Sequence, residues 1–179
     1  MRIVRLAAAL IAVAATAGSV SAQTATGSVT ASATVGAVLS ATNSANLNFG
    51  TGISPTAGSV VIGTGAAPSG TGQTLGAISI SHNSNFSTTV TGAPTTLDNG
   101  ANTLSVSFSC AYSTSASGAI VSGSGAACAS MGNRTVTTPG TTETTFLQVG
   151  GTLTVPANPA PGTYTGATAI SFLFTAVTS

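Results

Sequence analysis

The sequence predicts an all-β protein, a sandwich or a barrel of antiparallel strands, and three observations lead to this prediction. Short runs rich in Val, Ile, Thr and Phe recur between clusters of Gly, Pro, Asn and Ser, as in folds of short strands joined by turns. After the first 22 residues no segment has apolar residues at helical spacing. The chain is 42% hydrophobic with a formal net charge of +1, so it is not of the disordered class.

The first 22 residues are predicted to be an export signal and not part of the fold. Arg2 and Arg5 form a positive start, Leu6–Ala17 is a short apolar run, and Val20–Ala22 is a cleavage site of small residues. The run is shorter than the roughly 20 residues that span a membrane. We expect a bacterial exported protein that begins at Gln23 and has no membrane span after cleavage. It would pass through the periplasm to the cell surface or the extracellular space.

The remaining chain has the size of one domain, and we expect an N-terminal extension at 23–34 followed by a single β-sandwich domain at 35–179. Apolar and hydroxylated residues alternate along Ser28–Ser40, as in a strand with one buried face. This run is long for a strand of a small domain, and Gly36 is a natural place to divide it. The apolar face of the first part consists of Val29, Ala31, Ala33 and Val35.

Strands are predicted wherever β-forming residues follow one another between turn residues. In order they are Ser28–Leu39, Asn46–Phe49, Ser59–Ile62, Leu75–Ser81, Phe86–Thr91, Thr103–Tyr112, Thr144–Val149, Thr152–Val155 and Thr163–Val177, the last of which is expected to bend or break. Asp98–Gly100 predicts a tight turn, because Asn-Gly tolerates a positive φ. Three prolines in Val155–Gly162 predict a stiff connector. Ser113–Cys128 is expected to be a flexible loop.

The aromatic side chains are predicted to belong to the core. They are Phe49, Phe86, Phe108, Tyr112, Phe146, Tyr164, Phe172 and Phe174. In the last strand Ile170, Phe172 and Phe174 share one face.

Cys110 and Cys128 are the two cysteines of the chain. In an exported protein, two cysteines indicate one disulfide. A metal pair is the alternative, but the spacing is not CxxC and the chain has one histidine. We therefore predict a disulfide.

The sequence gives little support for catalysis or for binding of nucleic acid. The chain has no lysine, so it has no basic patch to neutralise phosphates. Asp98 is expected in a turn and Glu143 on the surface, which does not favour a carboxylate pair. His82 is expected at the end of a strand, and no nucleophile elbow accompanies it. We predict no catalytic, cofactor-binding or metal site, and keep a secreted enzyme or ligand-binding protein as a third alternative.

The strands carry almost no charge, whereas natural β-proteins protect their edge strands with Lys, inward charges, bulges or Pro. Two interpretations remain open. Loops and prolines cover the edges, or edge pairing is itself the function, as in β-strand addition.

Two motifs resemble a bacterial exported domain family of unknown function that is similar to the spore-coat-protein-U-like pilins of archaic chaperone–usher systems. They are "ANLNFG" at Ala45–Gly50 and "VGGTLTVPANPAPGTYTGATAISFLF" at Val149–Phe174. This resemblance implies an immunoglobulin-like sandwich that lacks one strand, which the N-terminal segment of the next subunit would supply. It also implies a periplasmic chaperone and an outer-membrane usher as partners.

The resulting hypothesis is a structural subunit of a surface fimbria or related polymer, with an adhesion or biofilm role, assembled as a homo-oligomer or polymer by strand addition. Val29, Ala31, Ala33 and Val35 would form the donated face, and the acceptor groove would include Ile170, Phe172 and Phe174. The alternative is a self-complete monomeric secreted β-sandwich, a surface or matrix protein without enzymatic activity.

Overall fold

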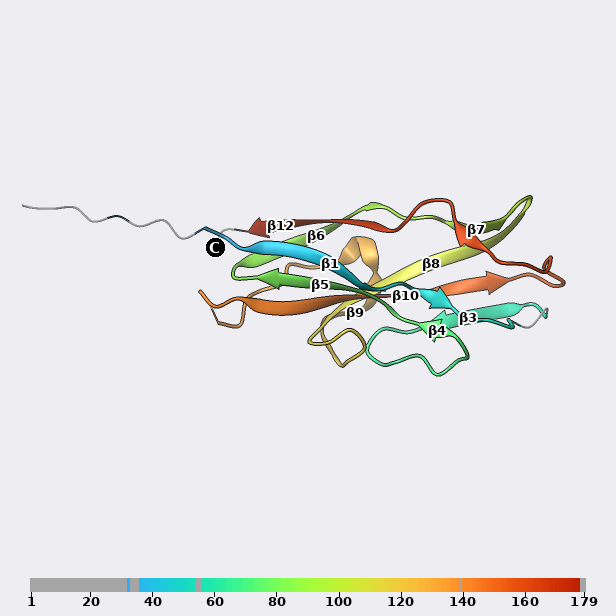
Figure 1. Ribbon diagram of the computed structural model, residues 1–179, viewed down its shortest axis with the longest axis horizontal. Helices are drawn as coiled ribbons and strands as arrows, with labels where there is room; N and C mark the ends of the chain where they lie inside the picture. The colour runs from blue at the N-terminus through green and yellow to red at the C-terminus, as the bar shows by residue number, and fades with distance from the viewer. Residues whose placement is uncertain (1–31, 33–35, 54–55, 139, 178–179) are drawn as a thin grey trace, which may run out of the picture. The chain divides into compact units, whose positions relative to one another are not determined.

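Backbone pairing between antiparallel strands builds this protein, as Figure 1 shows. The chain divides into two units, Met1–Val35 and Gly36–Ser179, and the described strands all lie in the second. The computed structural model describes residues 32, 36–53, 56–138 and 140–177.

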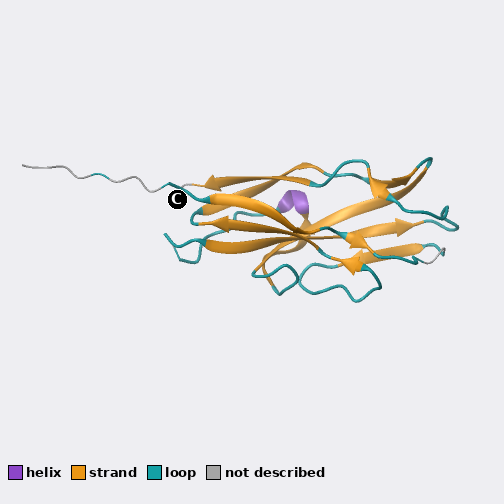
Figure 2. Cartoon of the chain, in the orientation of Figure 1, coloured by secondary structure: helices purple, strands orange, loops and turns teal. Residues whose placement is uncertain are grey.

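The described part of the chain is all-β and contains one short 3-10 turn and no α-helix (Figure 2). No helix in these ranges is long and apolar enough to cross a membrane. The elements are β1 (Leu39–Ala45), β2 (Asn48–Phe49), β3 (Gly58–Ile62), β4 (Gln73–Thr74), β5 (Gly76–His82), β6 (Asn85–Gly92), β7 (Thr96–Asn99), β8 (Asn102–Ser113), β9 (Ile120–Ala127), the 3-10 turn η1 (Cys128–Ser130), β10 (Glu143–Val155), β11 (Thr165–Gly166) and β12 (Ser171–Val177).

The 13-residue strand β10 is the centre of the larger, eight-stranded sheet. β8 pairs along one side of β10, while β5 and β3 share the other side, β5 along its first half and β3 along its second. Gly150 lies where β5 gives way to β3, and a Cβ atom there would collide with the backbone oxygen of Ile62. A glycine at this position therefore lets the strands approach closely.

A two-stranded sheet of β6 and β12 packs against the larger sheet. Phe86 of β6 is fully buried and makes edge-to-face contacts with His82 of β5 and Tyr112 of β8, at centroid distances of 4.8 and 5.7 Å. The Tyr112 hydroxyl donates a hydrogen bond of 2.6 Å to Thr88 Oγ1, and burial raises the pKa of this phenol. Because two antiparallel sheets pack against each other in this way, the prediction of an antiparallel β-sandwich is confirmed.

The apolar core consists of two clusters. One contains Phe49, Ile62, Leu75, Leu104, Val106, Leu153 and Val155. The other contains Ile80, Phe86, Cys110, Tyr112, Cys128, Leu147 and Val149. Leu47 and Phe108 are partly buried and pack against both clusters.

Most predicted strands are present with small changes at their ends. The strands predicted at Ser59–Ile62, Leu75–Ser81, Phe86–Thr91 and Thr103–Tyr112 correspond to β3, β5, β6 and β8. Thr144–Val149 and Thr152–Val155 form the single strand β10, because Gly150 and Gly151 continue the pairing with β8. The last predicted strand does break, into β11 and β12.

The prediction of a strand at Ser28–Leu39 is wrong at residues 36–38, and residues 28–31 and 33–35 lie outside the described residues. Residues 36–38 are not in a strand, and β1 begins at Leu39, where the prediction ended. Pairing with β5, from Leu39 opposite His82 to Ala45 opposite Ala77, decides where β1 lies. Register with a neighbour therefore outweighed the local alternation of apolar residues.

Two predictions about connections also need correction. Ser113–Cys128 is not a flexible loop throughout, because Ile120–Ala127 forms β9 and pairs with β8 next to the disulfide. Asp98 is not in the turn but in β7, opposite Thr103 of β8. The turn itself is Gly100–Ala101, and Gly100 has the expected positive φ of 62°.

Candidate functional site: an apolar groove between two strand edges

Two strand edges face each other where the larger sheet meets the smaller one. β1 pairs with β5 on one side and β12 pairs with β6 on one side. Among the described residues no strand pairs with the other side of either, although β1 and β12 approach each other closely. Such edges present backbone N–H and C=O groups that can bind a further strand.

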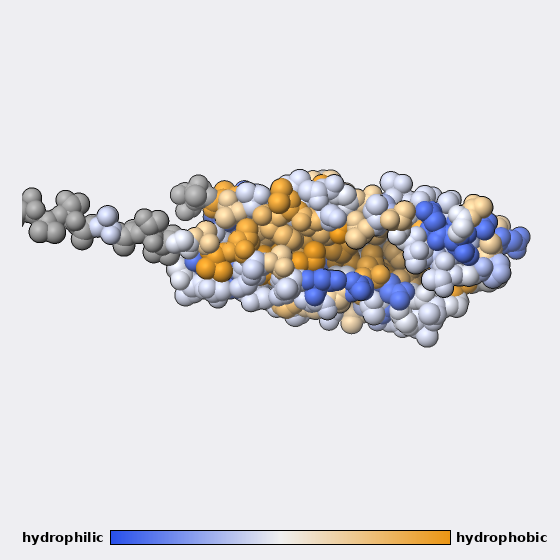
Figure 3. All heavy atoms as spheres, turned by 45° about the horizontal axis from the view of Figure 1, so that its top comes forward, coloured by the Kyte–Doolittle hydropathy of each residue, from blue (hydrophilic) through white to orange (hydrophobic). Residues whose placement is uncertain are grey.

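An apolar groove of about 1400 Å³ adjoins these two edges. This volume exceeds the roughly 300–1,000 Å³ of typical small-molecule pockets, so the groove has room for a segment of chain. Figure 3 shows apolar side chains gathered along a hollow in this face. The large apolar residues that line the groove include Leu47, Phe49, Ile53, Ile78, Leu97, Leu104, Phe108, Val149, Leu153, Val155, Tyr164, Ile170, Phe172 and Phe174.

The lining of the groove carries no charged side chain, and its polar members are mostly small. Asn43 and Asn46 lie on the β1 side, where the Asn43 side-chain amide donates a hydrogen bond of 2.7 Å to Asn46 Oδ1. A neutral, apolar surface does not attract ions or charged ligands. An apolar occupant of low charge matches this groove best.

The predicted groove residues Ile170, Phe172 and Phe174 all line this groove. All three are half-buried, and the Phe174 ring contacts that of Phe86 at a centroid distance of 6.1 Å. Parity in the last strand was enough to identify them. The prediction missed the facing wall on β1, where Ala41, Asn43 and Ala45 line the groove, because the strand had been placed too early in the sequence.

The predicted donor face, Val29, Ala31, Ala33 and Val35, lies outside the described residues. The Asn83 side chain holds the residues just before β1. Val38 N–H donates a hydrogen bond of 2.7 Å to Asn83 Oδ1, and Asn83 Nδ2 donates one of 3.4 Å to the Gly36 oxygen. The Asn83 N–H also donates to the Val38 oxygen at 3.2 Å.

The polar residues considered for catalysis lie apart from the groove. His82 is fully buried, its Nδ1 donates to the Ser84 oxygen at 3.0 Å, and its Nε2 is hydrogen-bonded to Thr145 Oγ1 at 2.9 Å. The hydrogen bond to Thr145 joins β5 to β10. Glu143 lies opposite His82 in the β5–β10 pair, whereas Asp98 is on β7. The described residues contain no cluster of metal-ligating side chains.

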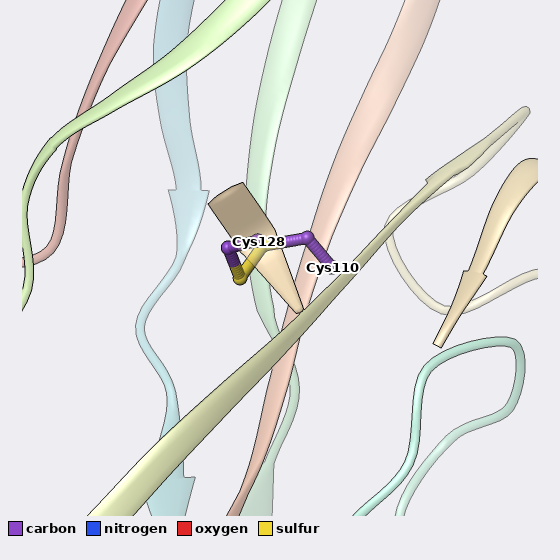
Figure 4. The surroundings of a disulfide bond; sticks show 2 residues. All are labelled: Cys110 and Cys128. Carbon is purple, nitrogen blue, oxygen red and sulfur yellow. A yellow bond between two sulfur atoms is a disulfide. The ribbon is translucent and has the colours of Figure 1, made fainter. Parts of the chain in front are cut away.

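The disulfide between Cys110 and Cys128 is confirmed (Figure 4). It joins β8 to η1, with Cα atoms 4.7 Å apart. Both cysteines are buried in the second core cluster. The bond therefore stabilises the side of the groove that carries Phe172 and Phe174, which pack against the same cluster.

The fold and this groove define an all-β protein with an apolar surface beside two strands, β1 and β12, each of which has one edge unpaired among the described residues. The chain belongs to a domain family of unknown function, DUF4402, whose model matches residues 39–173. This match begins at the first residue of β1 and ends within β12. Comparisons with curated proteins and with solved structures each found no significant match.

Proposed function

We propose that this protein is a structural subunit of a surface fimbria or a related extracellular polymer, assembled by strand addition. The groove between the free edges of β1 and β12 is the single observation that carries the proposal. A strand from a neighbouring subunit, residues 24–35, would enter the groove. It would pair with one or both edges and cover the apolar lining.

The division of the core supports this proposal. Leu47 and Phe108, which pack against both core clusters, both line the groove and are only partly buried. Apolar side chains of an added strand would lie against these two residues and against both clusters. Burial of apolar surface contributes about 25 cal/mol per Å², so filling the groove would stabilise the whole domain.

The lengths also agree. Val149 and Val155 of β10 both line the groove, and this separation of six positions along a strand spans about 20 Å. Val29 and Val35, the ends of the predicted donor face, are separated by the same number of residues. The central residues of this face are alanines, which fill little volume. Backbone hydrogen bonds to the strand edges would therefore supply much of the affinity, as in β-strand addition.

The directions of the strands suit a polymer. β1 begins opposite His82 and β12 ends opposite Asn85, so the two strands run in opposite directions and the end of β12 lies beside the start of β1. The donor segment precedes β1 at this end, while the groove extends toward Val155 and Tyr164. A donor and an acceptor on different parts of one surface form a head-to-tail contact, and such contacts generate open filaments.

The proposal includes export and helper proteins. An empty apolar groove is an aggregation hazard, so a periplasmic chaperone would cover it and an outer-membrane usher would exchange chaperone for subunit. Both partners follow from the resemblance to spore-coat-protein-U-like pilins. The export signal at residues 1–22 rests instead on the pattern of those residues, and the location at the cell surface depends on that signal.

Deletion of Gln23–Ser32 tests this function. The mature chain, residues 23–179, is expected to form polymers visible by negative-stain electron microscopy, and the deleted chain is expected to remain monomeric. A mature chain with Val29→Asp and Ala31→Asp is the matched control, because it keeps the length of the N-terminal segment and changes only its apolar face. It should also fail to polymerise. Polymers from the deleted chain would contradict the proposal. A stable wild-type monomer that binds no apolar dye would instead support a self-complete secreted β-sandwich.

A further inference from the structure

The residues just before β1 are held in an extended path by Asn83, which lies in the turn between β5 and β6. The Asn83 backbone N–H and the Val38 oxygen continue the β1–β5 pairing by one residue, after Leu39 opposite His82. The Asn83 side chain then accepts from Val38 N–H and donates to the Gly36 oxygen. Gly36–Val38 lie outside β1, but these contacts hold them in line with its start.

This path matters because the N-terminal segment could in principle fill the groove of its own molecule. To do so, the chain would turn back before β1 and pair with the free edge of β1. Three-residue hairpin loops are common, and a loop at Gly36–Val38 would place Val35 opposite Leu39. Continuing this antiparallel register, Ala33, Ala31 and Val29 would lie opposite Ala41, Asn43 and Ala45.

Those three residues of β1 are the ones that line the groove. Residues directly opposite each other in an antiparallel pair point to the same face. A loop at Gly36–Val38 is therefore the connection that would direct the apolar face of the segment into its own groove, in register.

The hydrogen bonds of Asn83 oppose this loop, because they hold Gly36 and Val38 in line with β1. With these bonds intact, the chain has to reverse before Gly36. A three-residue loop at 33–35 would place Gly27 opposite Ala41 and Gln23 opposite Ala45. Neither residue supplies apolar volume, so Ala25, opposite Asn43, would be the one apolar side chain among the three. Ala31 would lie before the loop, beyond the start of β1.

We infer that Asn83 is a positioning residue that prevents the N-terminal segment from filling its own groove and so commits it to the groove of a second copy of this chain. This inference rests on the proposed function. It explains why a segment attached to its own acceptor, at high effective concentration, would still donate to a neighbour.

The substitution Asn83→Ala tests this role in the mature chain. Size-exclusion chromatography with light scattering should show a severalfold rise in the monomer fraction at micromolar concentration. Asn83→Asp keeps the acceptor for Val38 N–H but loses the donor to the Gly36 oxygen, so its monomer fraction should stay closer to that of wild type than to that of Asn83→Ala. Asn102→Ala is the matched control, because Asn102 is exposed and its side chain makes one hydrogen bond of 3.5 Å, to Asn99. Melting curves verify that each variant is folded.

A cysteine pair, Ala31→Cys with Asn43→Cys, reports where the segment lies. In the Asn83→Ala background the pair should cross-link within one chain and migrate as a monomer on a non-reducing gel. With Asn83 present, cross-linked monomer should be scarce. Equal yields in the two backgrounds, or a folded Asn83→Asp chain that behaves as Asn83→Ala does, would overturn the inference.

Failure of the inference is distinguishable from failure of the proposed function. If the chain without Gln23–Ser32 still polymerises, the proposed function fails. If that chain is monomeric while the Asn83→Ala chain polymerises as wild type does, strand addition stands and only the role of Asn83 is overturned.

Discussion

Glu143 is one of the few charged residues of the domain, and backbone N–H groups hold it. Thr137 N–H and Thr138 N–H donate to Glu143 Oε1 at 2.9 and 2.6 Å. These hydrogen bonds, that of Thr137 first, lower the pKa of Glu143 below its ordinary value of 4.5. The carboxylate thus fixes residues 137 and 138 beside the start of β10.

Glu143→Gln is expected to lower stability at neutral pH and to lower it less in acid. Because the folded-state pKa is depressed, ionised Glu143 contributes stability above pH 4.5, and this contribution is lost as the pH falls through the folded-state value. Urea unfolding of wild type and variant at pH 7 and pH 3 measures the difference. A gap in unfolding free energy that is equal at the two pH values would contradict this account.

The sequence could place individual polar residues near the ends of strands, but it could not identify their partners. His82 was expected at the end of a strand and is the last residue of β5, while Glu143, expected on the surface, is the first residue of β10. Asn83 and Gln148 were not recognised, because their partners lie far away in the chain: Val38 is 45 residues from Asn83, and Gly65 is 83 residues from Gln148. A small polar side chain gives no local signal of such a contact.

At the scale of elements, Gln148 connects β10 to two loops on the side of the sheet opposite Leu147. Gln148 is fully buried. Its Oε1 accepts from Gly65 N–H at 2.7 Å, and its Nε2 donates to the oxygens of Ser115 and Gly118 at 3.1 and 2.9 Å. The side-chain amide therefore makes three of the four hydrogen bonds open to it. These bonds attach both loops to β10.

Gln148→Leu is expected to lower the free energy of unfolding by about 1–3 kcal/mol, because it removes three hydrogen bonds between a buried side chain and partly buried backbone groups. Urea unfolding measures this loss, and limited proteolysis should show faster cleavage near Ser115–Gly118. Thr152→Val is the control, since Thr152 is half-buried on the same face of β10 and makes no such set of hydrogen bonds. Equal effects of the two substitutions would show that Gln148 has no special role.

β9 shows why some elements could not be predicted. Its sequence, IVSGSGAA, has the composition of a loop, yet pairing with β8 and the nearby disulfide make it a strand. β1, with the sequence LSATNSA, is likewise defined by β5. By contrast, one part of β8 and one part of β10 alternate apolar and polar residues, and burial follows that alternation along residues 104–107 and 152–155. Composition therefore predicted strands that bury one face, and it failed for the edge strands β1 and β9.

At the scale of the whole molecule, the groove separates the free edges of β1 and β12, and both core clusters adjoin it. The sequence predicted one part of the groove lining, from Ile170 to Phe174. The groove itself arises from the pairing of β1 with β5 and of β12 with β6, and the second of these pairs residues such as Asn85 and Val177 that are far apart in the sequence.

A peptide of residues 24–35 should therefore bind and stabilise the chain that lacks Gln23–Ser32. A ligand that binds only the folded state raises the free energy of unfolding by about 2.7 kcal/mol at 100 times its Kd, and thermal unfolding with increasing peptide measures this. Isothermal calorimetry should give a negative heat-capacity change, the mark of apolar burial.

The control peptide carries Ser in place of Val29, Ala31, Ala33 and Val35, which keeps its length and its backbone hydrogen bonds. A second control carries Ala in place of Ser28, Thr30, Ser32 and Thr34, the opposite face of the strand. If the apolar face enters the groove, the first control loses binding and the second keeps it. Equal binding of both controls would mean that the backbone edges alone hold the segment, and that the apolar groove is not what selects it.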